Sequence, residues 1–178
     1  MKHLLLVDDE NNVLQALRRS LSRAFLGEDV SIELFDSPLA ALARAADQPF
    51  DLVLSDYRMP QMDGITFLKR FRELQPEAAR LILSASTDFD ILVSAINEAE
   101  VQRYVVKPWS DEELVSYIRA ALARGEQLQE DRRLADEVRL QHGELSAEEI
   151  ERRRLEAEEP GITRVKWGPD GSVILDEE

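Results

Sequence analysis

Cysteine is absent from this sequence of 178 residues, and its absence excludes several kinds of chemistry. Without thiols the chain can form no disulfide, bind no zinc ion through thiolates and use no thiolate as a nucleophile. A chain without cysteine also fits a reducing compartment, so we expect a cytoplasmic location.

Long hydrophobic runs are also missing. No stretch reaches about eighteen consecutive apolar residues, so the sequence predicts no membrane-spanning helix and no membrane partner. The apolar run near the start, Leu4–Val7, is interrupted at once by Asp8 and Asp9. It is too short for the apolar region of a secretory signal peptide.

Positive charge is scarce. The chain has 22 Lys and Arg against 36 Asp and Glu, a formal net charge of −14. Proteins that bind the phosphate backbone of nucleic acids need a basic surface, so we expect no DNA partner. Hydrophobic residues nevertheless make up 44% of the chain, which indicates a soluble globular core rather than a disordered chain.

The first two thirds of the chain alternate short apolar runs with segments of helical periodicity. Residues 30–34 alternate apolar with polar side chains, as in a half-buried edge strand, and continuous apolar runs lie at residues 4–7, 52–54, 81–83 and 104–106. Such runs are typical of strands buried on both faces of a parallel sheet. We therefore predict an α/β fold of five βα units, flavodoxin-like, with a five-stranded parallel sheet of order 2-1-3-4-5 and helices on both faces.

The composition changes near Gly125. Residues 125–178 contain 16 acids and 8 bases, a net charge of −8. We therefore divide the chain into a domain of residues 1–124 and an acidic C-terminal extension of residues 125–178. Within the extension, capping and turn residues predict helices at about residues 126–141 and 146–157 and a β-hairpin at about residues 162–175. A single glycine costs a helix only about 1 kcal/mol, so continuation of the preceding helix past Gly125 is an open alternative.

Polar side chains follow the predicted strands directly. Asp8 and Asp9 follow the first strand, Asp56 the third, Ser84 the fourth and Lys107 the fifth. In open parallel sheets, ligands bind at the carboxyl ends of the strands, and strands one and three are neighbours in the predicted order. Three carboxylates therefore converge, and their repulsion requires a cation among them. Oxygen ligands suit Mg²⁺.

This set of residues has the chemistry for phosphoryl transfer. A carboxylate beside Mg²⁺ can act as a nucleophile toward a phosphoryl group. The Lys107 ammonium would neutralise charge on the transferred oxygens, and the Ser84 hydroxyl would donate a hydrogen bond to one of them.

Four segments at these strand ends resemble the receiver domain of two-component response regulators. They are Leu6-Val7-Asp8-Asp9-Glu10, Ser55-Asp56-Tyr57-Arg58-Met59-Pro60 with Asp63-Gly64, Leu83-Ser84-Ala85, and Tyr104-Val105-Val106-Lys107-Pro108-Trp109. Each segment is a weak signal alone, but four in order at strand ends are specific. The resemblance covers about residues 1–124.

The resemblance implies a role for each matching residue. Asp56 matches the aspartate that accepts the phosphoryl group, and Lys107 matches the lysine that assists the transfer. Ser84 and Tyr104 match the hydroxyl and the aromatic residue that switch conformation afterwards. The peptide bond between Lys107 and Pro108 is expected to be cis.

The resemblance also implies a set of Mg²⁺ ligands. Asp8 and Asp9 match the family's acidic pair, and Asp9 and Asp56 would give oxygens to the metal directly. The backbone carbonyl of Arg58, two residues past the phosphoacceptor, matches a further ligand.

We therefore expect a response regulator that accepts a phosphoryl group from a sensor histidine kinase on Asp56. It would catalyse only its own phosphorylation and dephosphorylation and would not otherwise be an enzyme. A phosphorelay intermediate, which passes the group on to a histidine phosphotransfer protein, is the alternative. A scaffold that works without phosphorylation is a third hypothesis, and the intact acidic pocket argues against it.

The extension bears on the output of the protein. It is short for a DNA-binding domain with its own core, and it is acidic, so we expect output through protein–protein interaction. Its few apolar residues predict order only where it docks, either on its own receiver or, as we favour, on a second protomer in a homodimer. Trp167 is the expected anchor, because its large apolar face lies beside a tight turn.

Overall fold

The structure is a computed structural model that describes residues 1–85, residue 93, residues 97–141 and residues 147–158. The predicted hairpin at residues 162–175 lies outside these residues, as does Trp167. In the part of the chain that is described, no helix is long and apolar enough to cross a membrane.

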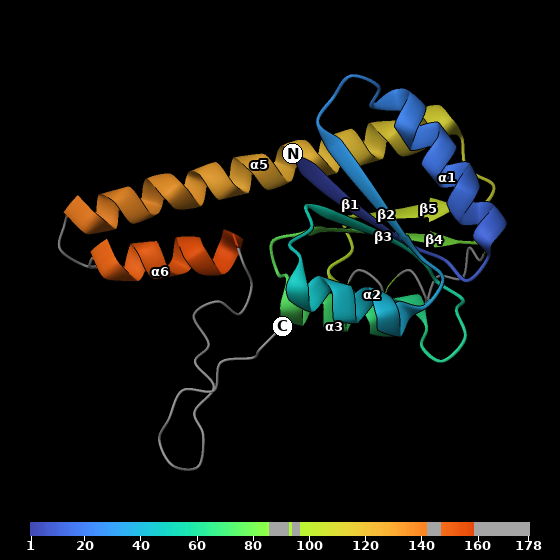
Figure 1. Cartoon of the computed structure of the whole chain (residues 1–178), viewed down its shortest axis with the longest axis horizontal. Helices are drawn as coiled ribbons and strands as arrows, with labels where there is room; N and C mark the ends of the chain where they lie inside the picture. Colours follow the sequence, from blue (N-terminus) through green and yellow to red (C-terminus); the bar gives the residue numbers. More distant parts are fainter. Residues whose placement is uncertain (86–92, 94–96, 142–146, 159–178) are drawn as a thin grey trace, which may run out of the picture.

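Five parallel strands form one sheet (Figure 1). They are β1 (Lys2–Val7), β2 (Val30–Phe35), β3 (Leu52–Asp56), β4 (Ala79–Ser84) and β5 (Arg103–Val106). Their order in the sheet is β2-β1-β3-β4-β5, so the predicted flavodoxin-like topology is confirmed. The three inner strands are almost entirely buried, which explains their continuous apolar runs.

Helices cover both faces of the sheet. Figure 1 shows α1 (Asn11–Ala24) and α5 (Asp111–Gln141) on one side, and α2 (Pro38–Asp47) and α3 (Gly64–Leu74) on the other. Residues 93 and 97–99, which precede β5, are also helical.

Alternate residues of the strands divide between two hydrophobic cores. Leu4 and Leu6 of β1 belong to the core under α1 and α5, whereas Leu5 belongs to the core under α2 and α3. All three leucines have no exposed surface. Burial of one such side chain stabilises the fold by about 1.5–3 kcal/mol, so the two cores hold the strand ends, and hence the site, in place.

Helix α3 begins immediately beyond the loop that follows Asp56. Asp63 is its N-cap, and the Asp63 carboxylate accepts hydrogen bonds from the amide (2.9 Å) and the hydroxyl (2.8 Å) of Thr66. Such a cap satisfies an amide at the helix start that has no partner within the helix. The cap therefore sets where α3 begins relative to Asp56.

Helix α5 runs without a break through the point where the composition changes. The helix predicted at residues 126–141 is the second half of α5, and Gly125 lies within it, where a Cβ atom would meet nothing within 4 Å. Two ion pairs join this second half to the body of the chain: Lys2 Nζ lies 3.2 Å from Glu126 Oε1, and Glu77 pairs with Arg132.

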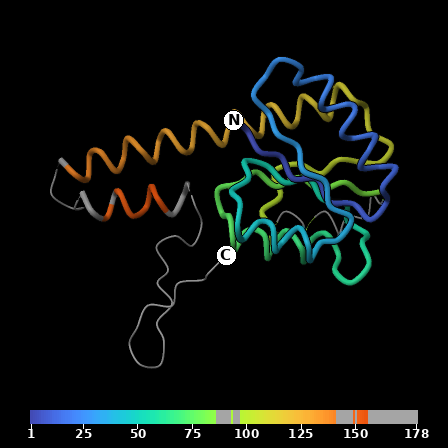
Figure 2. Tube along the Cα trace, in the orientation of Figure 1, coloured from blue at the N-terminus to red at the C-terminus, as the bar shows by residue number. Residues whose placement is uncertain are grey.

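Helix α6 (Ala147–Glu158) folds back beside the end of α5, as the trace in Figure 2 shows. Arg153 Nη1 of α6 lies 3.1 Å from Asp136 Oδ1 of α5, and the Asp136 side chain is 11% exposed. The described part of the extension thus contacts residues of the first domain and itself.

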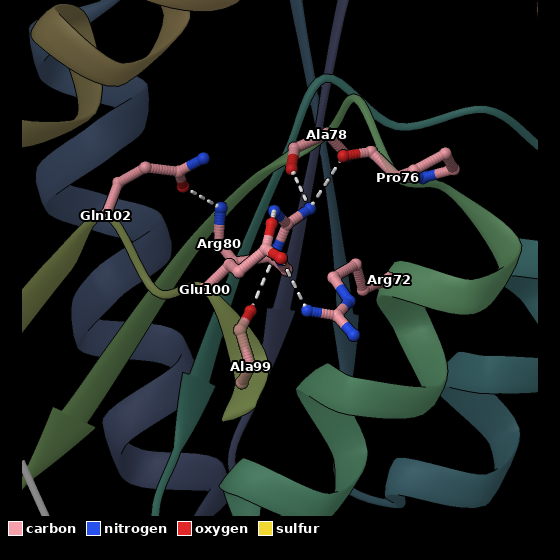
Figure 3. Close-up of polar contacts among 7 residues, drawn as sticks. All are labelled: Arg72, Pro76, Ala78, Arg80, Ala99, Glu100 and Gln102. Carbon is pink, nitrogen blue, oxygen red and sulfur yellow. Dashed lines mark hydrogen bonds and ion pairs between the residues drawn. The ribbon is translucent and has the colours of Figure 1, made fainter. Parts of the chain in front are cut away.

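A buried arginine joins two connections at the amino-terminal edge of the sheet (Figure 3). Arg80, near the start of β4, is 3% exposed. Its Nε donates to the carbonyl of Ala99 at 3.0 Å, and its Nη1 donates to the carbonyls of Pro76 at 3.0 Å and Ala78 at 2.7 Å. Its Nη2 lies 3.7 Å from the Glu100 carboxylate. The guanidinium thus ties the connection before β4 to the connection before β5.

Candidate functional site

Three strand ends bring Asp8, Asp56 and Lys107 together at the carboxyl edge of the sheet. Asp8 follows β1, Asp56 ends β3 and Lys107 follows β5. Lys107 Nζ lies 2.5 Å from Asp56 Oδ1 and 2.8 Å from Asp8 Oδ2. The ammonium group therefore bridges the two carboxylates.

Both carboxylates are held in a buried place by backbone amides. Asp8 has no exposed surface and Asp56 is 6% exposed. The Glu10 amide donates to Asp8 Oδ1 at 2.9 Å, and the Arg58 amide donates to Asp56 Oδ2 at 2.7 Å. Each carboxylate thus has one oxygen on a backbone amide and the other on Lys107, so its orientation is fixed before any ligand binds.

The electrostatics of the site follow from burial and from these contacts. Burial raises the pKa of Asp8 above its ordinary value, and the hydrogen bonds from Lys107 and Glu10 oppose this shift only in part. Burial by itself would lower the pKa of Lys107, but hydrogen bonds to Asp56 and Asp8 outweigh it, so this pKa is raised. Lys107 therefore carries a positive charge between the two carboxylates, which lessens their mutual repulsion.

Asp9, the third predicted acid, is exposed beside this pair. Within the residues that the structure describes, no three acidic or histidine side chains form a group that could hold a metal ion. The site therefore combines two buried carboxylates and one ammonium, with Asp9 at its rim.

Ser84 lies on β4, the strand next to that of Asp56, and Tyr104 lies on β5, one strand further along the sheet. Ser84 ends β4 and is 1% exposed, and its carbonyl accepts a hydrogen bond from the Lys107 amide at 2.8 Å. Tyr104 of β5 is partly buried and packs against the core under α2 and α3. The peptide bond between Lys107 and Pro108 is cis. Ser84 is thus tied to the residue whose ammonium reaches Asp56.

The family model of the response regulator receiver domain matches residues 4–119. The chain belongs to this family. The earlier resemblance is therefore confirmed, and the five-stranded sheet with its acidic carboxyl edge is that of a receiver domain.

Known proteins that are similar to this receiver domain include longer regulators. The hydrogenase transcriptional regulatory protein HoxA of Cupriavidus necator is 37% identical over 119 residues, which are 67% of this chain and 24% of HoxA. Regulatory protein AtoC of Escherichia coli is 34% identical over 146 residues, which are 82% of this chain and 29% of AtoC. The chain thus spans between 24% and 29% of the length of these two relatives.

Solved structures match the fold over most of the receiver. The receiver domain of an HD domain-containing protein from Pseudomonas fluorescens has a TM-score of 0.66 at 35% identity, covering 71% of this chain and 98% of that domain. A CheY-like receiver from Methanospirillum hungatei has a TM-score of 0.64 at 25% identity, covering 71% of this chain and 98% of that chain.

Gly64 supports the receiver's acidic edge, although sequence analysis placed it in a motif without a structural role. A Cβ atom at Gly64 would overlap the carbonyl oxygen of Asp56 and would lie 3.0 Å from the carbonyl carbon of Asp56 and from Cα of Tyr57. The first turn of α3 therefore packs directly against the peptide that follows Asp56. The Asp63-Gly64 pair was the available signal, because glycine permits such close backbone approach.

Ser55 is a second supporting residue, and sequence analysis assigned it no role. It is fully buried in β3, and its hydroxyl donates to the carbonyl of Asp56 at 2.8 Å. A serine within an otherwise apolar strand, next to the predicted phosphoacceptor, was the signal that could have identified it.

Proposed function

We propose that this chain is a response regulator whose receiver accepts a phosphoryl group from a histidine kinase on Asp56. The observation that carries this proposal is the contact of Lys107 with Asp56 Oδ1 at 2.5 Å, beside the buried Asp8. A carboxylate and a cation held in this way are what an incoming phosphoryl group requires.

The proposed reaction needs little covalent chemistry from the protein. An oxygen of Asp56 attacks phosphorus, the bond between phosphorus and the histidine nitrogen breaks, and an aspartyl phosphate forms. Lys107 is close enough to Asp56 to neutralise charge on the transferred oxygens. The Arg58 amide donates to the other carboxylate oxygen, and this hydrogen bond fixes the orientation of the Asp56 carboxylate, the nucleophile.

We also propose that the acidic edge holds Mg²⁺. The proposed donors are carboxylate oxygens of Asp8, Asp9 and Asp56 and the backbone carbonyl of Arg58, an all-oxygen set that fits Mg²⁺. The three carboxylates do not form a metal-holding group as they stand, so the Asp9 side chain would have to turn toward the buried pair when Mg²⁺ binds. Asp9 is exposed beside the buried pair, so this set includes one carboxylate open to water. When bound, Mg²⁺ would supply positive charge to the phosphoryl oxygens.

The test is chemical phosphorylation without a kinase. Acetyl phosphate with Mg²⁺ should add one phosphoryl group to the full chain, and reduction of the acyl phosphate followed by mass spectrometry should place it on Asp56. EDTA should abolish the product, because the carboxylates then lack their divalent cation. Labelling that is unchanged in EDTA, or that maps to another residue, would contradict the assignment.

We propose that the phosphoryl group is sensed through Ser84 and Tyr104. Ser84 follows Leu83, which pairs with Asp56 in the sheet, and Tyr104 pairs with Ile82 of the same strand. A hydrogen bond from the Ser84 hydroxyl to the phosphoryl group would pull the end of β4 inward and let Tyr104 turn toward it. A small local change would then alter the face around β5.

Ser84→Ala should separate phosphorylation from this response. The variant should accept phosphate from acetyl phosphate, because Asp56 and Lys107 are intact. Amide NMR shifts of residues 101–107 should no longer change on addition of beryllofluoride, whereas Ser84→Thr should keep the change because it keeps the hydroxyl. A wild-type response in Ser84→Ala would show that the signal takes another route.

We propose that the output is a protein contact made by the receiver face and the extension, and that a homodimer can form through the extension. Leu128, Leu134 and Val138 of α5 support this, because they are 56%, 47% and 53% exposed and offer apolar surface to a partner. HoxA is named a transcriptional regulatory protein, but the similarity covers only 24% of it. We therefore base the proposed output on this chain's own acidic extension.

A further inference from the structure

Ser55 lies directly before the proposed phosphoacceptor in the middle strand of the sheet. The side chains of β3 alternate between the two faces, yet the Ser55 hydroxyl turns along the strand and donates to the carbonyl of Asp56 at 2.8 Å. Both residues are buried, with Ser55 fully so and Asp56 6% exposed. This hydrogen bond is therefore shielded from water.

The Asp56 carbonyl that Ser55 contacts belongs to a tightly enclosed peptide group, the one between Asp56 and Tyr57. Gly64 packs so closely against it that a Cβ atom there would overlap the carbonyl oxygen. At the other end of the same peptide, the Tyr57 amide donates to the carbonyl of Leu83 at 2.8 Å. The peptide between Asp56 and Tyr57 is thus held by β4 at its amide, by Ser55 at its oxygen and by α3 at its side.

The orientation of this peptide decides how the Asp56 carboxylate and the Arg58 backbone face each other. Arg58 is the second residue beyond Asp56, and its amide reaches Asp56 Oδ2 at 2.7 Å across this peptide. A rotation of the peptide would carry the Arg58 amide and carbonyl away from the carboxylate, while Lys107 would still hold Asp56 Oδ1. Transfer depends steeply on such alignment.

We propose that Ser55 is a positioning residue for phosphoryl transfer, because its hydroxyl fixes the peptide that sets the Asp56 carboxylate against the Arg58 backbone. This inference rests on the proposed function of Asp56. Without the hydroxyl, the buried Asp56 carbonyl loses its hydrogen bond from Ser55. A rotation of the peptide group that gives this carbonyl another donor then becomes favourable. The nucleophile and the Arg58 carbonyl then lose their common alignment.

The test compares Ser55→Thr with Ser55→Val in the full-length chain. These two side chains have nearly the same shape and differ in the hydroxyl, so any strain from the added atoms is common to both. The rate of Asp56 phosphorylation is measured over a range of acetyl phosphate and Mg²⁺ concentrations, and thermal unfolding is followed in EDTA. Ser31, at the start of the edge strand β2, provides a matched control pair, Ser31→Thr and Ser31→Val.

The expected result is a slower reaction in Ser55→Val and the wild-type rate in Ser55→Thr. Loss of a residue that orients a reacting group or a metal ligand typically costs on the order of tenfold in rate or metal affinity, and we expect a loss of that size. In Ser55→Val the maximal rate should fall, or the Mg²⁺ concentration required should rise. The thermal midpoints of Ser55→Val and Ser55→Thr should differ too little to explain this change. The two Ser31 variants should react equally.

Equal rates for Ser55→Thr and Ser55→Val would overturn the role of the hydroxyl while leaving Asp56 as the phosphoacceptor. If neither variant folds, Ser55→Ala, which adds no atoms, takes the place of Ser55→Val and is compared with wild type. A wild-type rate in that variant would overturn the role as well. A wild-type chain that takes no label on Asp56 would overturn the proposed function, and this inference with it.

Discussion

Asp56→Asn should carry no aspartyl phosphate after incubation with acetyl phosphate and Mg²⁺, the largest effect expected of any single substitution here. The amide keeps the shape of the carboxylate, and its oxygen can still accept the hydrogen bond from the Arg58 amide. It lacks the negatively charged oxygen that attacks phosphorus. Lys107 keeps Asp8 as a charged partner, so the variant should remain folded.

The matched control is Asp63→Asn. Asp63 lies in the same connection between β3 and α3 but serves as the exposed N-cap of that helix. Asparagine is a comparably good N-cap, so this variant should be phosphorylated at the wild-type rate. Intact-mass spectrometry with acid-lability of the added group is the measurement. A label that persists in Asp56→Asn, on Asp8 or elsewhere, would contradict the assignment of the nucleophile.

Arg80→Met should lower the free energy of unfolding by about 3 kcal/mol or more, since each buried acceptor left without a donor costs about 1–3 kcal/mol. Methionine fills a similar length but cannot donate to the three carbonyls that the guanidinium now satisfies (Figure 3). Burial lowers the pKa of Arg80, but an arginine stays charged in a folded protein, so its donors are always present. Urea unfolding of the full chain measures the loss.

Arg72→Met is the control that separates the effect of burial from that of removing a positive charge. Arg72 Nη1 lies 2.7 Å from Glu100 Oε1, but the Arg72 side chain is 33% exposed and that of Glu100 is 63% exposed. An ion pair open to water contributes about 0–1 kcal/mol, so this variant should unfold close to wild type. Equal losses in the two variants would mean that the buried hydrogen bonds of Arg80 do not stabilise the fold beyond an ordinary surface charge.

Much of the fold could be predicted because its three inner strands are buried on both faces. Residues 52–54 and 81–83 read as continuous apolar runs for that reason, and their places in the sheet are as predicted. The ends of the strands were harder to predict from the sequence. β1 begins at Lys2 rather than Leu4, because Lys2 and His3 pair with β2 regardless of their polarity.

The acidic extension shows a different limit. Its composition predicted a boundary near Gly125, yet α5 passes through that residue as one helix. A single glycine costs a helix only about 1 kcal/mol, and the ion pair between Lys2 and Glu126 lies just beyond it. The change in charge composition therefore coincides with the point where α5 leaves the body of the receiver. It does not coincide with the end of a helix.

The candidate site divides in the same way between sequence and structure. By itself the sequence determined that Asp8, Asp56 and Lys107 lie at one edge, because each follows a strand and parallel strands end at the same edge. Only the tertiary structure decided that Lys107 bridges the two carboxylates while Asp9 stays exposed. Such details depend on side-chain directions and on contacts between strands far apart in the chain.

The supporting residues belong wholly to the tertiary structure. Ser55 acts on the backbone of its neighbour, and Gly64 acts through the close approach of α3. Arg80 donates to the carbonyls of Pro76 and Ala78 and to that of Ala99, which lies far from them in the chain and is brought beside them by the packing of the connections before β4 and β5. Periodicity reports which residues are buried. It does not report which backbone groups lack partners there, and those groups give Ser55, Gly64 and Arg80 their roles.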